Sequence, residues 1–354
     1  GTGELVSPKR IRVEGENSLF LEAEAIVLAT GSEPKKLALL PVDGRVIVDS
    51  TGLLSLKKLP KKLVIVGGGI IGCEFASLYA SLGVEITIVE VLPRILPGES
   101  IEISEALSKA FIKRGIRLEV DYRVSRAEIR TDGVTLYAEG RLPAQADLCL
   151  VAIGRSLRTD RIGLEKAGIQ TDAAGLIPVN HEMQPPVRGI YAIGDIASRW
   201  WLAHVATHQG LVAADHICGK KVWFSDHAIP SVIFTDPEIA TVGLSLTQAK
   251  ERGIDAQEST FPFGALGKAE SMGKTEGYFR VVFIPKTGQI VGAQAMGYEA
   301  GGWIGEMTLA IANELTIDCI AETMHAHPTF PEGWMEASLQ AIGLPLHMRI
   351  SPKR

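Results

Sequence analysis

Residues 63–72 read LVIVGGGIIG, and this stretch decides the fold. Its first four residues form an apolar run rich in β-branched side chains, which is typical of a parallel strand covered on both faces. A helical pattern continues to Leu82 and is closed by Gly83, a residue type that favours helix ends. Residues 85–90, EITIVE, form the next strand. This order predicts a Rossmann-type α/β unit.

The glycine-rich turn of this unit predicts a dinucleotide site. Gly67 permits the tight turn, Gly69 lets the backbone approach a pyrophosphate, and Gly72 allows close helix–strand packing. The N-terminus of the helix supplies free N–H groups and the positive end of a dipole. The predicted pyrophosphate site therefore comprises Gly67, Gly68, Gly69, Ile70, Ile71 and Gly72. The alternative is a glycine-rich turn that holds no ligand.

Glu90 ends the second strand, eighteen positions after Gly72 (90 − 72). An acid at this place binds the ribose hydroxyls of NAD(H) and repels the 2′-phosphate of NADP(H). The sequence thus favours NAD(H) as the nucleotide.

The rest of the chain, which has 354 residues, divides into four predicted parts. They are residues 1–35, the NAD-binding domain (36–156), a loop-rich part (157–229) and a C-terminal α+β domain (230–354). In the NAD-binding domain we expect a helix over Ser104–Arg114 and a return strand within Ala146–Gly154, and a helix of small residues follows over Leu202–Cys218. In the last part we expect antiparallel strands at Ser231–Phe234, Ile239–Gly243, Tyr278–Ile284 and Gln289–Met296, and helices at Gly305–Glu314 and Trp334–Ile342.

Composition excludes several classes of function. The net charge of −5 and the lack of a basic cluster argue against a nucleic-acid or anionic-membrane surface. The longest apolar stretch, Leu63–Val84, contains Glu74 and three consecutive glycines, so no membrane span is expected. Four scattered cysteines form no metal or disulfide pattern and predict buried thiols in a reducing compartment, the cytoplasm or, in a eukaryote, the mitochondrial matrix.

Two strand ends are candidate flavin contacts. Thr30 and Gly31 follow one apolar strand, and Gly194 and Asp195 follow another. A carboxylate there accepts hydrogen bonds from a sugar-alcohol chain, and the nearby helix N-terminus favours the negative charge of a reduced flavin. The alternative is an ordinary strand end without a ligand.

His327 and Glu332 are the candidate catalytic pair, in the segment HAHPTFPE over residues 325–332. Histidine exchanges protons near neutral pH, and a carboxylate on its other ring nitrogen fixes the tautomer and raises the basicity. The alternative is a surface histidine in a proline-rich loop.

In this order the motifs resemble the pyridine nucleotide–disulfide oxidoreductases, over essentially the whole chain. The resemblance implies a homodimeric enzyme with FAD and NAD, which reoxidises dihydrolipoyl groups on the lipoyl domain of a 2-oxo acid dehydrogenase complex. It implies that residues 1–35 are a remnant of a flavin domain and that residues 157–229 are its second part. It also implies that His327 is the acid/base and Glu332 its orienting carboxylate. To the cofactor sites it adds Glu74, Gly154, Leu202, Ala203 and His204. Alternatives are a mercuric or glutathione reductase of the same family, and a non-catalytic NAD-binding scaffold.

The chain departs from this family pattern at two places. The family's first glycine fingerprint, for FAD, and its C-x-x-x-x-C disulfide do not occur in the sequence, which enters in the middle of a β pattern. We therefore expect that an N-terminal segment is missing and that these 354 residues alone are inactive. Pro331 stands where the family usually has serine, so the geometry of the His327–Glu332 pair is expected to differ slightly.

The acid at position 90 predicts that the chain binds NADH far more tightly than NADPH. Glu90→Arg should relax this preference because it replaces a repulsive charge by an attractive one for the 2′-phosphate. Fluorescence titration of both nucleotides checks this, and equal affinities for the unmodified chain would contradict it.

Overall fold

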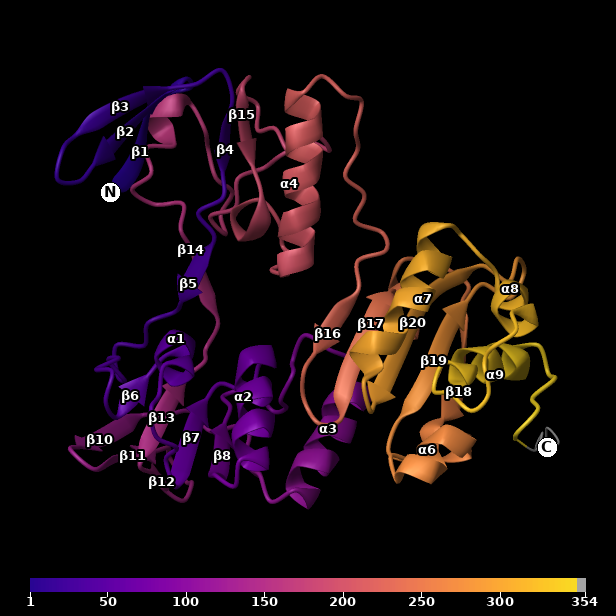
Figure 1. Ribbon diagram of the computed structural model, residues 1–354. Coiled ribbons are helices and arrows are strands. Elements are labelled where there is room, and N and C mark those ends of the chain that lie inside the picture. The colour runs from indigo at the N-terminus through magenta and orange to yellow at the C-terminus, as the bar shows by residue number, and fades with distance from the viewer. Residues whose placement is uncertain (349–354) are drawn as a thin grey trace. The chain divides into compact units, whose positions relative to one another are not determined.

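A computed structural model of the protein describes residues 1–348. The chain forms two compact units (Figure 1). One unit comprises Gly1–Lys35 and Arg155–Asp226, and the other comprises Lys36–Gly154 and the chain from His227 onward. The division into four domains stays a prediction.

The first unit contains a three-stranded antiparallel sheet, a short parallel pair and a long helix. The sheet has the order β1-β2-β3, β4 pairs with β15 in parallel, and β5 pairs with β14 antiparallel. Helix α4 packs on β15, where Tyr191 meets Val212 and Ala213 (Figure 1). The elements are β1 (Thr2–Ser7), β2 (Arg10–Glu14), β3 (Leu19–Glu22), β4 (Ile26–Leu28), β5 (Ser32–Pro34), β14 (Arg155–Leu157), the 3₁₀ turn η1 (Glu165–Ala167), β15 (Ile190–Ala192), the 3₁₀ turn η2 (Gly194–Ile196) and α4 (Ala203–Ile217).

The second unit begins with the predicted Rossmann-type fold. Its five-stranded sheet has the order β6-β13-β7-β8-β9, and all four pairings are parallel. Residues 63–66 are buried on both faces of this sheet, as the apolar run predicts. The elements are β6 (Ile47–Val48), α1 (Ser50–Leu54), β7 (Lys62–Val66), α2 (Ile70–Ser81), β8 (Glu85–Val89), α3 (Ile101–Lys113), β9 (Arg117–Glu119), the antiparallel set β10 (Arg126–Arg130), β11 (Gly133–Tyr137) and β12 (Ala144–Ala146), and β13 (Leu148–Val151).

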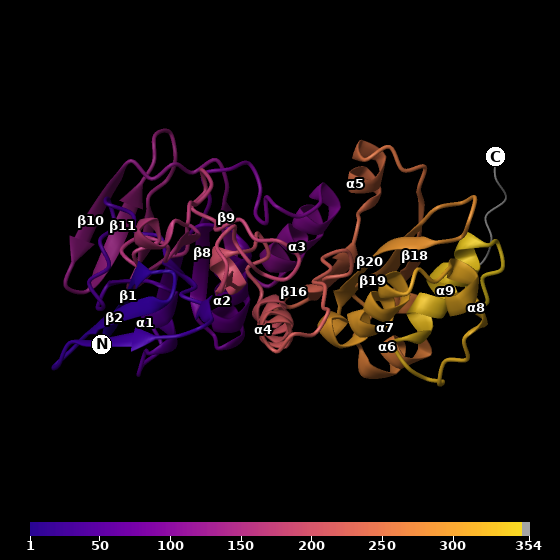
Figure 2. The same cartoon turned by 90° about the horizontal axis from the view of Figure 1, so that it is seen from above.

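The second unit ends in the predicted antiparallel α+β fold. Its sheet has the order β16-β17-β20-β19-β18, and α7 and α9 lie along one face of it (Figures 1 and 2). The opposite face contributes Ile233, Ile239 and Met296 to the core of the Rossmann part. The elements are β16 (Ser231–Ile233), β17 (Glu238–Gly243), α5 (Leu246–Glu251), β18 (Gln257–Pro262), the 3₁₀ turn η3 (Phe263–Ala265), α6 (Gly267–Met272), β19 (Tyr278–Phe283), β20 (Ile290–Gly297), α7 (Ala300–Ala312), α8 (Ile317–Glu322) and α9 (Glu332–Ala341).

Two predicted helix starts are wrong. Helix α3 begins at Ile101 rather than Ser104, because the Ser100 hydroxyl caps it by accepting the Ile103 N–H at 3.3 Å. Helix α7 begins at Ala300 rather than Gly305. The glycines of its first turn hid this start, and the Gly301 N–H is satisfied by the Glu238 carboxylate at 3.0 Å.

The expectation of four buried thiols is wrong for two of them. Cys73 and Cys149 are buried, and burial raises the pKa of both, that of Cys149 to about 12. Cys218 and Cys319 are exposed, since they lie at the C-terminus of α4 and on the outer face of α8. Among residues 1–348, no helix is long and apolar enough to cross a membrane.

Gly333→Ala is expected to destabilise the protein. An added Cβ would lie 2.1 Å from Phe279, which is fully buried between Phe263 and Trp334 and cannot move aside. We expect a loss of about 1–3 kcal/mol in unfolding free energy, measured by urea denaturation. Gly305→Ala, in α7 with open space around its Cβ, is the control and should be neutral or slightly stabilising. Equal effects of the two substitutions would contradict the packing argument.

Candidate functional site

The glycine turn between β7 and α2 has the geometry of a phosphate cradle. Gly67 has a φ of 112°, and a Cβ there would lie 2.4 Å from the Ala152 carbonyl oxygen. A Cβ on Gly72 would lie 2.0 Å from the Gly67 carbonyl oxygen, whereas one on Gly69 would meet nothing within 4 Å. Gly69 is also the N-cap of α2, and no side chain caps the helix. The space and the free N–H groups of Gly69, Ile70 and Ile71 fit a dinucleotide pyrophosphate.

Glu90 is buried at the end of β8 and ties this strand to the glycine turn. One carboxylate oxygen accepts the Gly68 N–H at 2.6 Å, and the other accepts the Leu92 N–H at 2.8 Å. Each oxygen keeps a second lone pair, so the carboxylate can still accept hydrogen bonds from ribose hydroxyls. The sequence did not reveal that Glu90 also holds the turn itself.

Glu74 and Gly154 are the other two residues predicted for the nucleotide site. Glu74 is on α2, and its carboxylate accepts the Phe234 N–H at 3.0 Å. Burial raises the pKa of Glu74, and the Phe234 hydrogen bond opposes this rise. Gly154 follows β13 with a φ of 111°, a conformation that favours glycine.

The predicted flavin contacts lie in the first unit, around Asp195 in turn η2. The Ser32 hydroxyl donates to the Asp195 carboxylate. Arg155 in turn donates through Nε to the Ser32 hydroxyl at 2.6 Å and through Nη2 to the Ser32 carbonyl at 2.7 Å. Ser32 and Arg155 thus fix Asp195, a role that sequence reasoning missed. The position of Arg155, directly after the predicted return strand within Ala146–Gly154, was the one available signal.

Helix α4 is joined to this turn. The Gly194 N–H donates to the Gln209 side chain at 2.7 Å, and a Cβ on Gly194 would lie 3.4 Å from Ala206. Leu202 is the N-cap of α4, Ala203 and His204 open the helix, and no side chain caps it. Just before β5, the Thr30 hydroxyl donates a hydrogen bond to the Arg158 carbonyl at 2.6 Å, and Gly31 has a φ of 68°. A carboxylate beside an uncapped helix N-terminus fits part of a flavin.

His327 and Glu332 form the predicted pair. His327 Nδ1 lies 2.8 Å from Glu332 Oε1, and Glu332 Oε2 accepts the Thr329 N–H at 2.7 Å. A carboxylate only accepts, so Nδ1 carries the hydrogen and Nε2 is left to take up a proton. The imidazole is 69% exposed while the Glu332 side chain is 9% exposed. With Pro331 as its N-cap, α9 begins at Glu332 and places this carboxylate.

His325 lies two residues before His327 and is bound at both ring nitrogens, to the Glu306 carboxylate and the Thr323 carbonyl. The hydrogen bond that His325 donates to Glu306 raises the pKa of His325, against the effect of burial. Sequence reasoning missed Glu306, which lies on α7 and leaves no local signal. Among residues 1–348, no group of three or more histidine, cysteine or acidic side chains could hold a metal ion.

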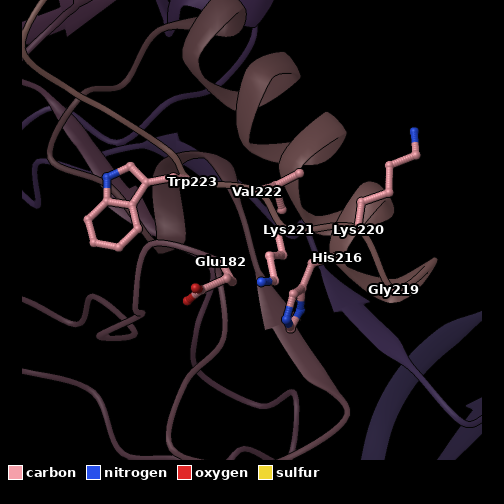
Figure 3. Close-up of a pocket in the computed structure, with 7 residues that line it drawn as sticks. All are labelled: Glu182, His216, Gly219, Lys220, Lys221, Val222 and Trp223. Carbon is pink, nitrogen blue, oxygen red and sulfur yellow. The ribbon is translucent and has the colours of Figure 1, made fainter.

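A surface pocket of about 560 Å³ lies apart from the predicted residues of the first unit (Figure 3). It is at the C-terminal end of α4, and none of the predicted cofactor contacts lines it. Its lining residues are Glu182, His216, Gly219, Lys220, Lys221, Val222 and Trp223.

Comparison with known proteins identifies the family to which this chain belongs. Residues 3–210 match the pyridine nucleotide-disulphide oxidoreductase family, and residues 229–338 match the dimerisation domain of that family. The chain belongs to this family, as the motifs predicted. It is by family an oxidoreductase with FAD and a pyridine nucleotide, and the dimerisation domain supports a homodimer.

Two of the similar relatives are named dihydrolipoyl dehydrogenase. The dihydrolipoyl dehydrogenase of Chlamydia pneumoniae is 48% identical, over 98% of this chain and 75% of the relative. A dihydrolipoyl dehydrogenase of Bacillus subtilis is 38% identical, over 98% and 76%. Among solved structures, LpdA of Mycobacterium tuberculosis superimposes with a TM-score of 0.90 at 28% identity, over 96% of this chain and 76% of that one.

The His325–Glu306 pair predicts a pH-dependent contribution to stability. The pKa of His325 is raised in the folded protein. The stability that the pair contributes is therefore complete below the ordinary pKa of histidine. It is lost as the pH rises through the raised pKa of the folded protein. Glu306→Gln should therefore cost about 1–2 kcal/mol of unfolding free energy near pH 6 and less near pH 9. Urea denaturation at both pH values measures this, and a loss that does not change with pH would refute it.

Proposed function

We propose that the residues of this chain serve the reaction of a dihydrolipoyl dehydrogenase, the oxidation of protein-bound dihydrolipoamide to lipoamide. The observation that carries the proposal is the His327–Glu332 pair, with a buried carboxylate behind an exposed imidazole. The names of the relatives support the choice of substrate. Bound FAD and a redox disulfide would relay two electrons to NAD⁺, which takes them as hydride, while a proton is released.

In this proposal His327 takes the proton of the substrate thiol. Its Nε2 is the unbound ring nitrogen, and it would come within about 3 Å of the thiol. Glu332 stabilises the imidazolium that forms, because its carboxylate holds the Nδ1 hydrogen at 2.8 Å. The exposure of the ring gives the proton a path to solvent.

The remaining residues would bind and orient the cofactors. Gly67–Gly72 would hold the NAD pyrophosphate and Glu90 the adenosine ribose, with Glu74 and Gly154 at the edges of the site. Asp195, fixed by Ser32 and Arg155, would accept hydroxyls of the flavin side chain. A larger set would surround the flavin, namely Thr30, Gly31, Gly194, Leu202, Ala203 and His204.

The proposed partner is the lipoyl domain of a 2-oxo acid dehydrogenase complex, and the proposed location is the cytoplasm, or the mitochondrial matrix in a eukaryote. A glutathione- or mercuric-reductase activity is the weaker candidate, since Glu90 opposes the 2′-phosphate of NADPH.

His327→Ala tests the proposal in protein expressed from its complete gene. Removing an acid/base group should lower dihydrolipoamide turnover by about 10²–10⁴-fold. NADH-dependent reduction of an artificial dye should be retained, because it needs no thiol deprotonation. Spectrophotometric assays measure both activities.

His347→Ala is the matched control. His347 also binds a buried carboxylate, that of Glu336, through Nδ1 and is 53% exposed. Its removal should leave turnover unchanged. Loss of turnover in the His347 variant with full activity of His327→Ala would contradict the assignment.

A further inference from the structure

Two histidines of one loop lie in opposite surroundings. His327 is 69% exposed, whereas His325, two residues earlier, is 6% exposed. The proposed reaction uses the exposed ring of His327 and assigns no role to the buried ring of His325.

The contacts of His325 define its protonation state. Nδ1 lies 2.8 Å from the Thr323 carbonyl oxygen, and Nε2 lies 3.0 Å from Glu306 Oε1. A carbonyl and a carboxylate are both acceptors, so each ring nitrogen must carry a hydrogen. The ring is therefore an imidazolium, and the raised pKa of His325 agrees with this state.

Two carboxylates act on this buried cation from different elements. Glu306 comes from α7 and binds it directly, and Glu332, the first residue of α9, also attracts it. Glu332 is at the same time the partner of His327. Glu332 thus interacts with both the His325 cation and the His327 ring.

We propose that His325 is a positioning residue for the reaction, a fixed imidazolium that anchors the loop to α7 and weakens the hold of the His327–Glu332 pair on a proton. The positive charge near Glu332 offsets part of the attraction that this carboxylate exerts on protonated His327. The charge of His325 thereby acts on the pair that the proposed reaction uses. This inference rests on the proposed function.

His325→Gln tests the proposal in protein expressed from its complete gene. Glutamine retains one N–H donor and removes the charge, so the acid limb of the pH profile of kcat/KM for dihydrolipoamide should move upward by about 0.5–1 pH unit. Activity at pH 6 should then fall about 3–10-fold more than activity at pH 8.5. His325→Lys, which restores a cation with several donors, should return the limb toward its original position.

Glu322→Gln is the matched control, because it removes an exposed carboxylate three residues from His325. It should leave the profile unmoved. A His325→Gln variant that loses the same factor of activity at every pH would show a purely structural anchor and overturn the proposal.

A second measurement decides the case where the variants do not fold. In unmodified protein with ¹⁵N-labelled histidine, both ring nitrogens of His325 should remain protonated through pH 8, and a neutral ring at pH 7 would overturn the proposal. Absence of dihydrolipoamide turnover in the unmodified protein would instead count against the proposed function, since the NMR titration does not depend on it.

Discussion

The candidate catalytic site depends on the hydrogen bonds of one carboxylate, that of Glu332. Its two oxygens bind two parts of one loop, the His327 ring and the Thr329 N–H. Glu332 also opens α9, where the helix dipole favours a negative charge. The next residues of α9, Trp334 and Ala337, are fully buried against the antiparallel sheet. The orientation of an exposed imidazole is therefore set by core packing, and the contact of His325 with Glu306 gives the loop a second anchor, on α7.

A buried carboxylate with backbone hydrogen bonds also supports the glycine turn between β7 and α2. Glu90 is buried, and burial of a charge is costly unless hydrogen bonds replace the lost water. The N–H groups of Gly68 and Leu92 supply those bonds and join the end of β8 to the glycine turn. The acid that is predicted to select the nucleotide is thus also part of the scaffold of the predicted site. In the first unit, Ser32 and Arg155 give Asp195 the corresponding support. In each case the carboxylate is positioned before a ligand arrives, which lowers the ordering cost of binding.

Sequence patterns were sufficient for features whose signal is local. Residues 63–90 predicted a strand, a turn, a helix and a strand, and the structure has them as β7, α2 and β8. The His327–Glu332 pair was predicted because five positions separate its members across a short turn. Ser32, Arg155, Gln209 and Glu306 were missed, because their partners lie between 15 and 163 positions away. The thiols of Cys218 and Cys319 were wrongly expected to be buried, since the face that a helical residue presents depends on tertiary packing.

Pairing with a carboxylate does not by itself make a histidine a catalytic base. Among residues 1–348 there are three such pairs, of His325 with Glu306, His327 with Glu332 and His347 with Glu336. His325 is bound at both nitrogens and has no site for another proton. The Glu336 carboxylate is fully buried and also accepts the N–H groups of Leu346 and His347, so this pair ties the following chain to α9. His327 differs because its partner is the first residue of a helix and its loop also contains a buried cation. A free Nε2 and a fixed Nδ1 hydrogen are what a general base needs, and the neighbouring positive charge is the further element that we propose for His327.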